Sequence, residues 1–559
     1  MGRPLSMLSF LLQAESWPAN PFNFKIINLA IHLINGGLIA ALFLTTGKIS
    51  PRFALPTPLI ALVVFIWMVH PMQVGNVLYV VQRMNLLASF FTLLGMVGYL
   101  WSRNRFMVSG KNLFVVLMVT IPVVAALLGL LSKENGVLIY VYLAALELTI
   151  LNSAKNSSEL NRARIGAVFL PLMLGAIAFL FYLPTVIADY DLKSFTLLER
   201  VFTQFPVLLS YLLAILVPRS GAYSLFHDDF PIYNTLLAIP VLLSFLIIAC
   251  SIAFAFRYRN KFTVIAFAIL WFLFGHSLES TFLPLEMYFE HRNYLPMLGP
   301  IFAIVFSLHW AWEKWTTRRM QLGSISCLFF LWLCFVSLQQ STIWGDSLEH
   351  AYAEVFYRPD SYRAQTHLIQ TVANLGDIST GFELQKEFIA SGNAGLSGYV
   401  RSLEFGCLLN GIEFPSAEDL RIQAQNAQQD FSVVALLNNL VIGINSGACQ
   451  QVPRTSVDII LQELTNNTLF AVSRPDLLQL RALLSAGESN YVLAAELAEE
   501  SFNIRRDLRT NLLRIGWLIE AGDLNQAESV LQEFESEFSA EIANREGLAE
   551  QIRLLQESL

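Results

Sequence analysis

FKIINLAIHLINGGLIAALFLTT, residues 24–46, is long and apolar enough to cross a lipid bilayer. A spanning helix needs about 20 mostly apolar residues, and this stretch has one charged side chain, Lys25, near its start. Nine similar segments follow it, all before residue 342. The ten segments are 24–46, 55–70, 84–101, 112–131, 136–151, 165–187, 234–256, 262–283, 293–311 and 320–341. The sequence therefore predicts an all-α, polytopic membrane helical bundle of about ten spans over residues 1–341.

Composition and charge divide the chain at the same place. The chain is 55% hydrophobic and 14% charged, with a mean hydropathy of +0.53, whereas a soluble globular protein is about a quarter charged. Residues 1–341 carry 22 Lys+Arg and 13 Asp+Glu, and residues 342–559 carry 14 and 30. The net charges are +9 and −16, so we predict a membrane domain followed by an acidic soluble domain.

Lys and Arg in short loops mark the cytoplasmic side of a membrane protein. Five loops of this chain are basic, and they alternate with the other loops if the short apolar run 203–218 is a re-entrant segment that enters and leaves on one side. The basic loops contain Lys48 and Arg52; Arg103, Arg105 and Lys111; Lys155, Arg162 and Arg164; Arg257, Arg259 and Lys261; and Lys314, Arg318 and Arg319. This pattern predicts a bacterial inner-membrane protein whose N-terminus and residues 342–559 face the periplasm. Met1–Phe10 does not read as a signal peptide, so this topology calls for one more helix upstream.

The outer loops differ from the basic ones because they hold acidic and basic residues side by side at the ends of apolar segments. Ionisable groups at membrane depth are expensive and usually functional. Arg and Lys suit a lipid phosphate, and a neighbouring carboxylate suits a general base or a metal ligand. The sequence thus predicts an outer-leaflet site for an anionic, lipid-linked substrate. The candidate residues are Arg83, Lys133, Glu134, Glu199, Arg200, His227, Asp228, Asp229, Glu290, His291 and Arg292.

Each of these motifs also has a structural explanation. Arg83 either contacts a phosphate or extends its charge to the interface. Glu134 caps the helix that follows it, and Lys133 either sits in a tight turn or has a functional role. Glu199 and Arg200 form either an intrahelical pair or part of the site.

Two motifs remain. His227-Asp228-Asp229 forms either a solvated turn before Pro231 or a divalent-cation site on Asp228 and Asp229. Glu290-His291-Arg292 begins an apolar helix from the outer side, which favours a functional role over a plain loop.

Seven motifs in order along the chain carry a family resemblance. After residues 2–43 they are HPMQVGNVLYVVQRMNLLASFFTLL (70–94), SKENG (132–136), ERVFTQF (199–205), HDDFP (227–231), FEHRNYLPMLGP (289–300) and WGDSLEHA (344–351). Together they resemble the transmembrane-and-tetratricopeptide (TPR) O-mannosyltransferases and their bacterial relatives. The resemblance covers nearly the whole chain.

The resemblance implies a GT-C glycosyltransferase fold, a polyprenyl-phosphate sugar donor and a TPR domain outside the cytoplasm. It implies that the Glu290-His291-Arg292 motif helps to hold the lipid phosphate. From their own positions among the outer-side cations, Arg83, Lys133 and Arg200 are predicted to contact the same phosphate. Family members carry their acidic base in the outer loop of a first helix that precedes the motifs found here. We therefore expect this chain to lack that base, and Glu134, Asp228 and Glu290 are the alternatives within it.

The sequence of residues 342–559 predicts paired helices. Glycines of LGD, LNG, NSG, SAGE and EAGD recur at 376, 411, 447, 487 and 522, close to the period of about 34 residues of a TPR. The segment NLLRIGWLIEAGDLNQAESVLQEF, with Ala527 in its second helix, is the best unit. We predict a TPR-like α-solenoid, or else an irregular helical domain, that binds basic or polar acceptor proteins and not nucleic acid. Cys407 and Cys449 form one disulfide if the domain is extracytoplasmic, or remain two buried thiols.

The leading hypothesis is a membrane glycosyltransferase that moves a sugar from a polyprenyl phosphate to a hydroxyl of an exported protein or of a glycan. The alternative is a non-catalytic membrane scaffold with a protein-binding tail. A transporter is a third possibility, but it would place ionisable groups at mid-membrane, whereas here they cluster at one face. No nucleotide-binding loop or zinc spacing is found in the sequence.

Overall fold

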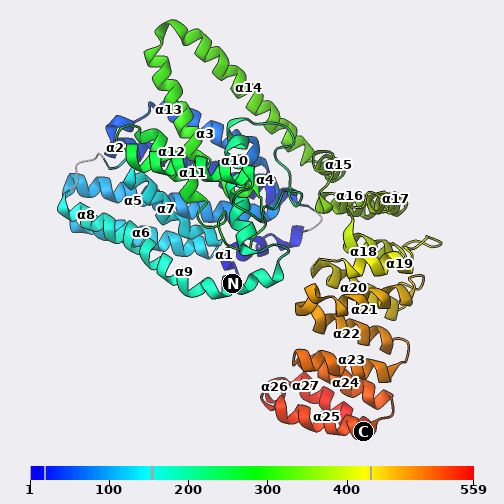
Figure 1. The fold of residues 1–559 in the computed structure, drawn as a ribbon. Helices are drawn as coiled ribbons and strands as arrows, with labels where there is room; N and C mark the ends of the chain where they lie inside the picture. Colours follow the sequence, from blue (N-terminus) through cyan, green and yellow to red (C-terminus); the bar gives the residue numbers. More distant parts are fainter. Residues whose placement is uncertain (1, 18–19, 153–156, 429–430) are drawn as a thin grey trace. The chain divides into compact units, whose positions relative to one another are not determined.

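The computed structural model describes residues 2–17, 20–152, 157–428 and 431–559, so Lys155 of the third basic loop lies outside the described residues. The described residues form helices and loops and no strand (Figure 1). The prediction of an all-helical chain is confirmed. The chain forms two compact units: unit 1 comprises Met1–Tyr190 and Phe195–Ser361, and unit 2 comprises Asp191–Ser194 and Tyr362–Leu559.

The described residues of unit 1 form fifteen α-helices. They are α1 Pro4–Leu11, α2 Phe22–Ile49, α3 Thr57–Val69, α4 Val74–Leu78, α5 Arg83–Ser109, α6 Asn112–Leu130, α7 Ile139–Leu148, α8 Ser158–Arg164, α9 Leu170–Ala188, α10 Leu197–Leu216, α11 Ile239–Tyr258, α12 Thr263–Gly275, α13 Leu298–Lys314, α14 Arg319–Ile343 and α15 Ser347–Tyr357.

Several of these helices have the length and composition of membrane spans. Among the described residues seven helices qualify, or eight if a bent pair counts as one span. The bent pair is Thr57–Val69 and Pro71–Leu78, with a bend of 55°. Pro71 causes the break, because a residue before proline is driven out of the helical conformation, and His70 is extended. The seven are Phe22–Ile49, Val80–Ser109, Asn112–Leu130, Ser158–Ala188, Leu197–Leu216, Ile239–Tyr258 and Thr316–Ile343.

The structure differs from the predicted ten spans in three segments. Predicted spans 136–151, 262–283 and 293–311 contain the shorter helices α7, α12 and α13, with 10, 13 and 17 residues. Apolar runs of 10–14 residues are typical of buried core helices. Both α7 and α12 are largely buried inside unit 1, so their apolar side chains pack against protein.

The run 203–218, predicted as re-entrant, is part of the continuous 20-residue helix α10. A capping box between Thr196 and Glu199 starts this helix six residues before the apolar run, because the reciprocal hydrogen bonds satisfy free backbone N–H groups at the helix start. The extra turn and a half gives α10 the length of a membrane span.

A buried carboxylate joins three elements of unit 1 at the end marked by the basic loops. Glu147 of α7 accepts a hydrogen bond of 2.7 Å from the Tyr99 hydroxyl and pairs with Arg103 at 3.4 Å and Arg164 at 2.6 Å. The side chains of Glu147 and Arg103 are fully buried. Arg103, predicted as a basic loop residue, therefore lies within α5 and binds a counter-ion.

Unit 2 is a succession of helix pairs, drawn from olive-yellow to red in Figure 1. The five recurring glycines each lie between the two helices of one pair, and four of them have positive φ, the exception being Gly487. The helices are α16 Tyr362–Asn374, α17 Ile378–Ala390, α18 Gly395–Phe405, α19 Ala417–Gln425, α20 Phe431–Asn445, α21 Arg454–Asn466, α22 Arg474–Ala486, α23 Tyr491–Ile504, α24 Leu508–Glu520, α25 Leu524–Glu537, α26 Ser539–Asn544 and α27 Glu546–Ser558.

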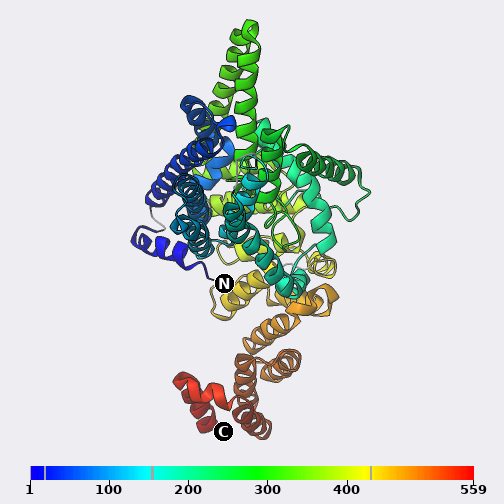
Figure 2. The same ribbon diagram turned by 90° about the vertical axis from the view of Figure 1, so that its left-hand side faces the viewer.

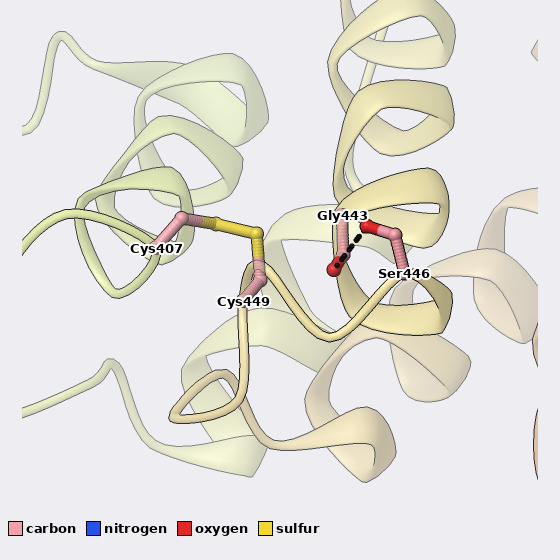
Figure 3. The surroundings of a disulfide bond; sticks show 4 residues. All are labelled: Cys407, Gly443, Ser446 and Cys449. Atoms are coloured by element: carbon pink, nitrogen blue, oxygen red, sulfur yellow. Dashed lines mark hydrogen bonds between the residues drawn. A yellow bond between two sulfur atoms is a disulfide. The ribbon is translucent and has the colours of Figure 1, made fainter.

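A disulfide joins two pairs of unit 2, between Cys407 after α18 and Cys449 after α20 (Figure 3). Gly443 makes room for it, because a Cβ there would lie 2.4 Å from the sulfur of Cys449. Ser446 donates a 3.1 Å hydrogen bond to the Gly443 carbonyl and ends α20 beside the bridge. Of the two states that the sequence left open, the structure has the disulfide.

The disulfide predicts a definite count of reactive thiols. The full chain, denatured without reductant and alkylated, should gain three labels, on Cys250, Cys327 and Cys334, and five after reduction. The bridge spans 42 residues, so its loss should lower the stability of unit 2 by about 4 kcal/mol in the loop-entropy model. Pulse proteolysis of a Cys407→Ser, Cys449→Ser variant measures this loss. Five labels without reductant would contradict the bridge.

The Glu147 cluster predicts a large loss of stability for a nearly isosteric change. Glu147→Gln leaves the buried guanidinium of Arg103 without a counter-charge, which costs about 3–5 kcal/mol. Thermal unfolding of the purified protein in detergent should shift clearly downward. Glu159→Gln, an exposed carboxylate on α8, is the matched control and should unfold like the parent.

Candidate functional site

Four segments of unit 1 meet at the end of the helices that carries the predicted outer loops. They are the start of α5, the turn η5 Glu134–Leu138, the break around η3 Pro71–Gln73, and the loop 276–297 with its turn η8 Glu290–Asn293. Turn η8 packs on η3 and α4, and η5 packs on α5. These packings bring polar residues distant in sequence into one region.

The turn between α6 and η5 is closed by two glycines. A Cβ on Gly136 would lie only 2.3–2.5 Å from backbone atoms of Gly129 and Leu130, so the two backbones are in direct contact. This close approach requires glycine, and it holds the residues of the turn between them, Lys133 and Asn135, in place.

Glu279 is the centre of the polar region. Its Oε1 lies 2.9 Å from the Lys133 ammonium, and its Oε2 accepts a 2.9 Å hydrogen bond from the Asn135 amide. The His291 ring nitrogen Nε2 lies 4.0 Å from Oε1. The Lys133 and Glu279 side chains are only 8% and 12% exposed, so this ion pair is largely removed from water.

Charge and burial act in opposite directions on these groups. Burial alone would raise the pKa of Glu279, but the nearby Lys133 charge, with the Arg292 charge and the Asn135 hydrogen bond, holds that pKa well below its usual range. Burial, followed by the charge of Lys133, lowers the pKa of His291 well below its usual value. His291 is therefore a neutral imidazole at neutral pH, and Lys133 is the cation that balances Glu279.

Two hollows share His291 as a wall. The first, which we call the Glu290 hollow, is lined by Asn76, Gln82, Ser224, Glu290 and His291 among others, and encloses about 430 Å³ of empty space including its mouth. The second, the Arg292 hollow, is lined by Asn85, Asn135, Tyr142, His291 and Arg292 among others, and encloses about 280 Å³. Of the predicted site residues, the structure thus places Glu290, His291 and Arg292 around adjoining spaces.

Glu290 is held by the loop that follows α10. It accepts hydrogen bonds from the His227 ring nitrogen Nε2 and from the backbone N–H of Ser224, the latter at 3.2 Å. A second carboxylate, Glu354 of α15, accepts from the Ser224 hydroxyl and from the Leu225 backbone N–H at 3.0 Å. Burial raises the pKa of Glu354. The two carboxylates therefore bind residues 224–227 by hydrogen bonds, and Glu290 also faces the Glu290 hollow.

The predicted phosphate-binding arginines have structural partners. Arg83 is fully buried and donates to Asn28 Oδ1 and to the carbonyls of Ser9 and Phe24, at 2.9–3.0 Å. Arg200, also fully buried, donates to the carbonyls of Glu279, Leu285 and Glu286. Neither lines the two hollows.

Arg292 both has structural partners and lines a hollow. Its guanidinium donates to the carbonyls of Met287, at 3.1 Å, and Glu286, at 2.5 Å, and it lines the hollow named after it. Arg200 and Arg292 together hold the same loop by its backbone carbonyls. Loss of either would displace Glu279 and Glu290.

The other predicted carboxylates are engaged elsewhere. Glu134 forms a bidentate ion pair with Arg3, at 2.8 and 3.1 Å, and about half of the Glu134 side chain is exposed. Burial would raise the pKa of Glu134, but the Arg3 hydrogen bonds and charge produce a net lowering. Asp228 accepts from the Ser361 hydroxyl, and Asp229 pairs with Arg358 at 3.4 Å.

These partners do not fit the divalent-cation site predicted on Asp228 and Asp229. Within residues 2–17, 20–152, 157–428 and 431–559, no group of three or more His, Cys, Asp or Glu side chains is placed to hold a metal ion.

Sequence reasoning missed Glu279. The predicted span 262–283 covered it, whereas α12 ends at Gly275. A signal was available, because an acidic residue late in an apolar run needs a cation, and Lys133 is a basic residue on the predicted outer side. Asn135 and Gln82 were missed too. Gln82 lies 3.3 Å from His291 Nδ1.

An apolar groove reaches the site from the side of the helices. It runs between α3, α13 and α14, is lined by Leu59, Ile66, Val305, Phe330 and Leu333 among others, and encloses about 1380 Å³ including its open side. It extends from Pro56 to His70, about 20 Å along a helix axis. Pro71, the next residue, lines the Glu290 hollow, so groove and hollow lie end to end.

The lowered pKa of Glu279 predicts a pH-dependent stability. A carboxylate whose folded pKa lies below its unfolded value of about 4.3 contributes stability above that value and loses it as the pH falls through the folded pKa. Glu279→Gln should therefore lower the thermal midpoint of the detergent-purified protein at pH 7. The difference from the parent should shrink only below about pH 4. Glu159→Gln, an exposed residue of α8, should show neither effect.

Comparison of the chain with models of known protein families, with curated proteins and with solved structures gives no match. The function is therefore inferred from the site and from the motif resemblance.

Proposed function

We propose that this chain is a membrane glycosyltransferase that moves a sugar from a polyprenyl-phosphate donor to a hydroxyl of an exported protein. The observation that carries the proposal is the junction of a buried cationic site with a long apolar groove. Lys133 and Arg292 lie at one end of the membrane-length helices, and the α3–α13–α14 groove ends beside the Glu290 hollow, which shares His291 with the Arg292 hollow. A ligand with a phosphate head and a long apolar tail matches both.

In this proposal the groove holds the polyprenyl chain and the Arg292 hollow receives the phosphate. A phosphate leaving group gains negative charge as the bond to the anomeric carbon breaks. Fixed cations in a water-poor site stabilise such charge more than water does. Arg292 and Lys133 supply that stabilisation, and Glu279 keeps Lys133 charged and oriented. Arg83 and Arg200 act as positioning residues.

The Glu290 hollow receives the acceptor. Of the three predicted bases, Glu134, Asp228 and Glu290, only Glu290 lines one of the two hollows described above. The proton of the acceptor hydroxyl passes to Glu290 as the oxygen attacks the anomeric carbon. His227, bonded to Glu290 through Nε2, fixes the orientation of the carboxylate.

The same proposal places unit 2 outside the cytoplasm of a bacterial inner-membrane protein. The Cys407–Cys449 disulfide supports this, because disulfides persist in oxidising compartments such as the periplasm. The TPR-like helix pairs, with their acidic surface, bind the acceptor protein.

A non-catalytic scaffold is the second candidate. One observation favours it: Glu134, Asp228 and Glu290 each already bind a donor within the described chain. A scaffold would keep unit 2 as a protein-binding surface, and the polar site as a structural core.

The decisive experiment compares sugar transfer by Glu290→Gln and by the parent, at equal abundance in membranes, from a polyprenyl-phosphate donor to exported protein. General-base catalysis typically contributes 10²–10⁴-fold, so kcat should fall by about that factor. Donor binding should change little, because the amide keeps the size of the side chain and Arg292 is intact.

Glu159→Gln, on the exposed face of α8, is the control and should transfer at the parental rate. No transfer by the parent, with acceptor binding retained, would favour the scaffold. Full transfer by Glu290→Gln would assign the base elsewhere.

A further inference from the structure

A second groove lies at the opposite end of unit 1 from the candidate site. We call it the Trp315 groove. It is formed by the residues that follow α2, the start of α12 and the end of α13, and encloses about 1790 Å³ including its open side. Helix α12 separates the two regions, since Thr263 lines this groove and Gly275 the Arg292 hollow.

The mouth of the groove is cationic. Arg52 and Lys261 line it, and both are exposed. No Asp or Glu is among the lining residues, and neither cation pairs with a carboxylate within the described parts of the chain. Arg52 lies 5.5 Å from the Phe53 ring centre, and Lys261 lies 5.4 Å from that of Phe262. Both charges are thus available to an anion at the mouth.

The walls of the groove are apolar and aromatic. Apolar residues of α12 and α13 line them, including Ile265 and Phe306, and Trp310 and Trp315 flank the opening with about half of each ring exposed. Trp315 ends α13 at the tip of the α13–α14 hairpin, which projects from unit 1 in both views (Figures 1 and 2). Exposed Trp beside Lys and Arg at the end of membrane-length helices is typical of the membrane–water interface.

We propose that the Trp315 groove binds an anionic diacyl phospholipid. The charge complementarity decides the class: two unpaired cations at the mouth fit an anionic headgroup, and the apolar walls fit acyl chains. Basic pockets between membrane helices on the cytoplasmic side are known to hold acidic headgroups. A zwitterionic lipid would bring an ammonium group next to Arg52 and Lys261. This site stands independently of the glycosyltransferase proposal.

The test measures binding of phosphatidylglycerol and phosphatidylethanolamine to the full chain by native mass spectrometry, after delipidation in detergent. The parent should retain phosphatidylglycerol preferentially. Arg52→Gln with Lys261→Gln should weaken that binding by about tenfold or more, since a basic residue near an anionic surface contributes about 1 kcal/mol. Phosphatidylethanolamine binding should stay unchanged.

Arg105→Gln with Lys111→Gln is the matched control, because these exposed cations lie at the end of α5 and just after it and line no part of the groove. It should bind like the parent. Ile265→Trp should weaken binding of both lipids by filling the groove while leaving its charge unchanged. Soluble glycerol phosphate should not compete. Equal loss in the control pair, absence of headgroup preference in the parent, or competition by glycerol phosphate would overturn the proposal.

Discussion

The backbone of residues 279–287 sets the constraint on which the site depends. These residues are part of the connection between α12 and α13 and precede its turn η8. Their carbonyls need donors, since an unpaired buried polar group costs free energy. Arg200 of α10 and Arg292 of η8 provide those donors. The positions of Glu279 and Glu290 follow from these bonds. The guanidinium groups of Arg200 and Arg292 thus stabilise the fold of this loop, and only that of Arg292 also faces a hollow.

The fold was predictable to the extent that it depends on composition. Long apolar segments and recurring glycines identify a helical membrane domain and a domain of helix pairs. The number of membrane spans was not predictable from composition, because α12 is apolar for a different reason: it packs inside the protein. Hydropathy measures transfer from water and does not distinguish lipid from a protein core. The extent of α10 depended on a capping box, which is a local polar signal outside the apolar run.

The candidate site, like the fold, was predictable from the sequence only in part. Glu290, His291 and Arg292 were predictable because charge at the start of an apolar helix is unusual. Glu279 was not, because its meaning depends on Lys133, which is distant in sequence. The opposite error concerns Arg83, whose charge suggested a ligand. Its guanidinium instead stacks on Phe10 and Phe24, 4.8 and 5.2 Å from their ring centres. A sequence reveals charged residues but not which of them already have a partner.

Unpaired charge is the property that separates structural from binding groups in this molecule. Arg103 is buried with a carboxylate at 3.4 Å, so a ligand there would have to compete with an existing ion pair. Arg52 and Lys261 are exposed beside apolar walls with no such partner among the described residues. The two ends of unit 1 therefore suit different ligands. In the two proposals, the enclosed end binds a phosphate that loses its water for reaction, and the open end binds a headgroup that stays in contact with water.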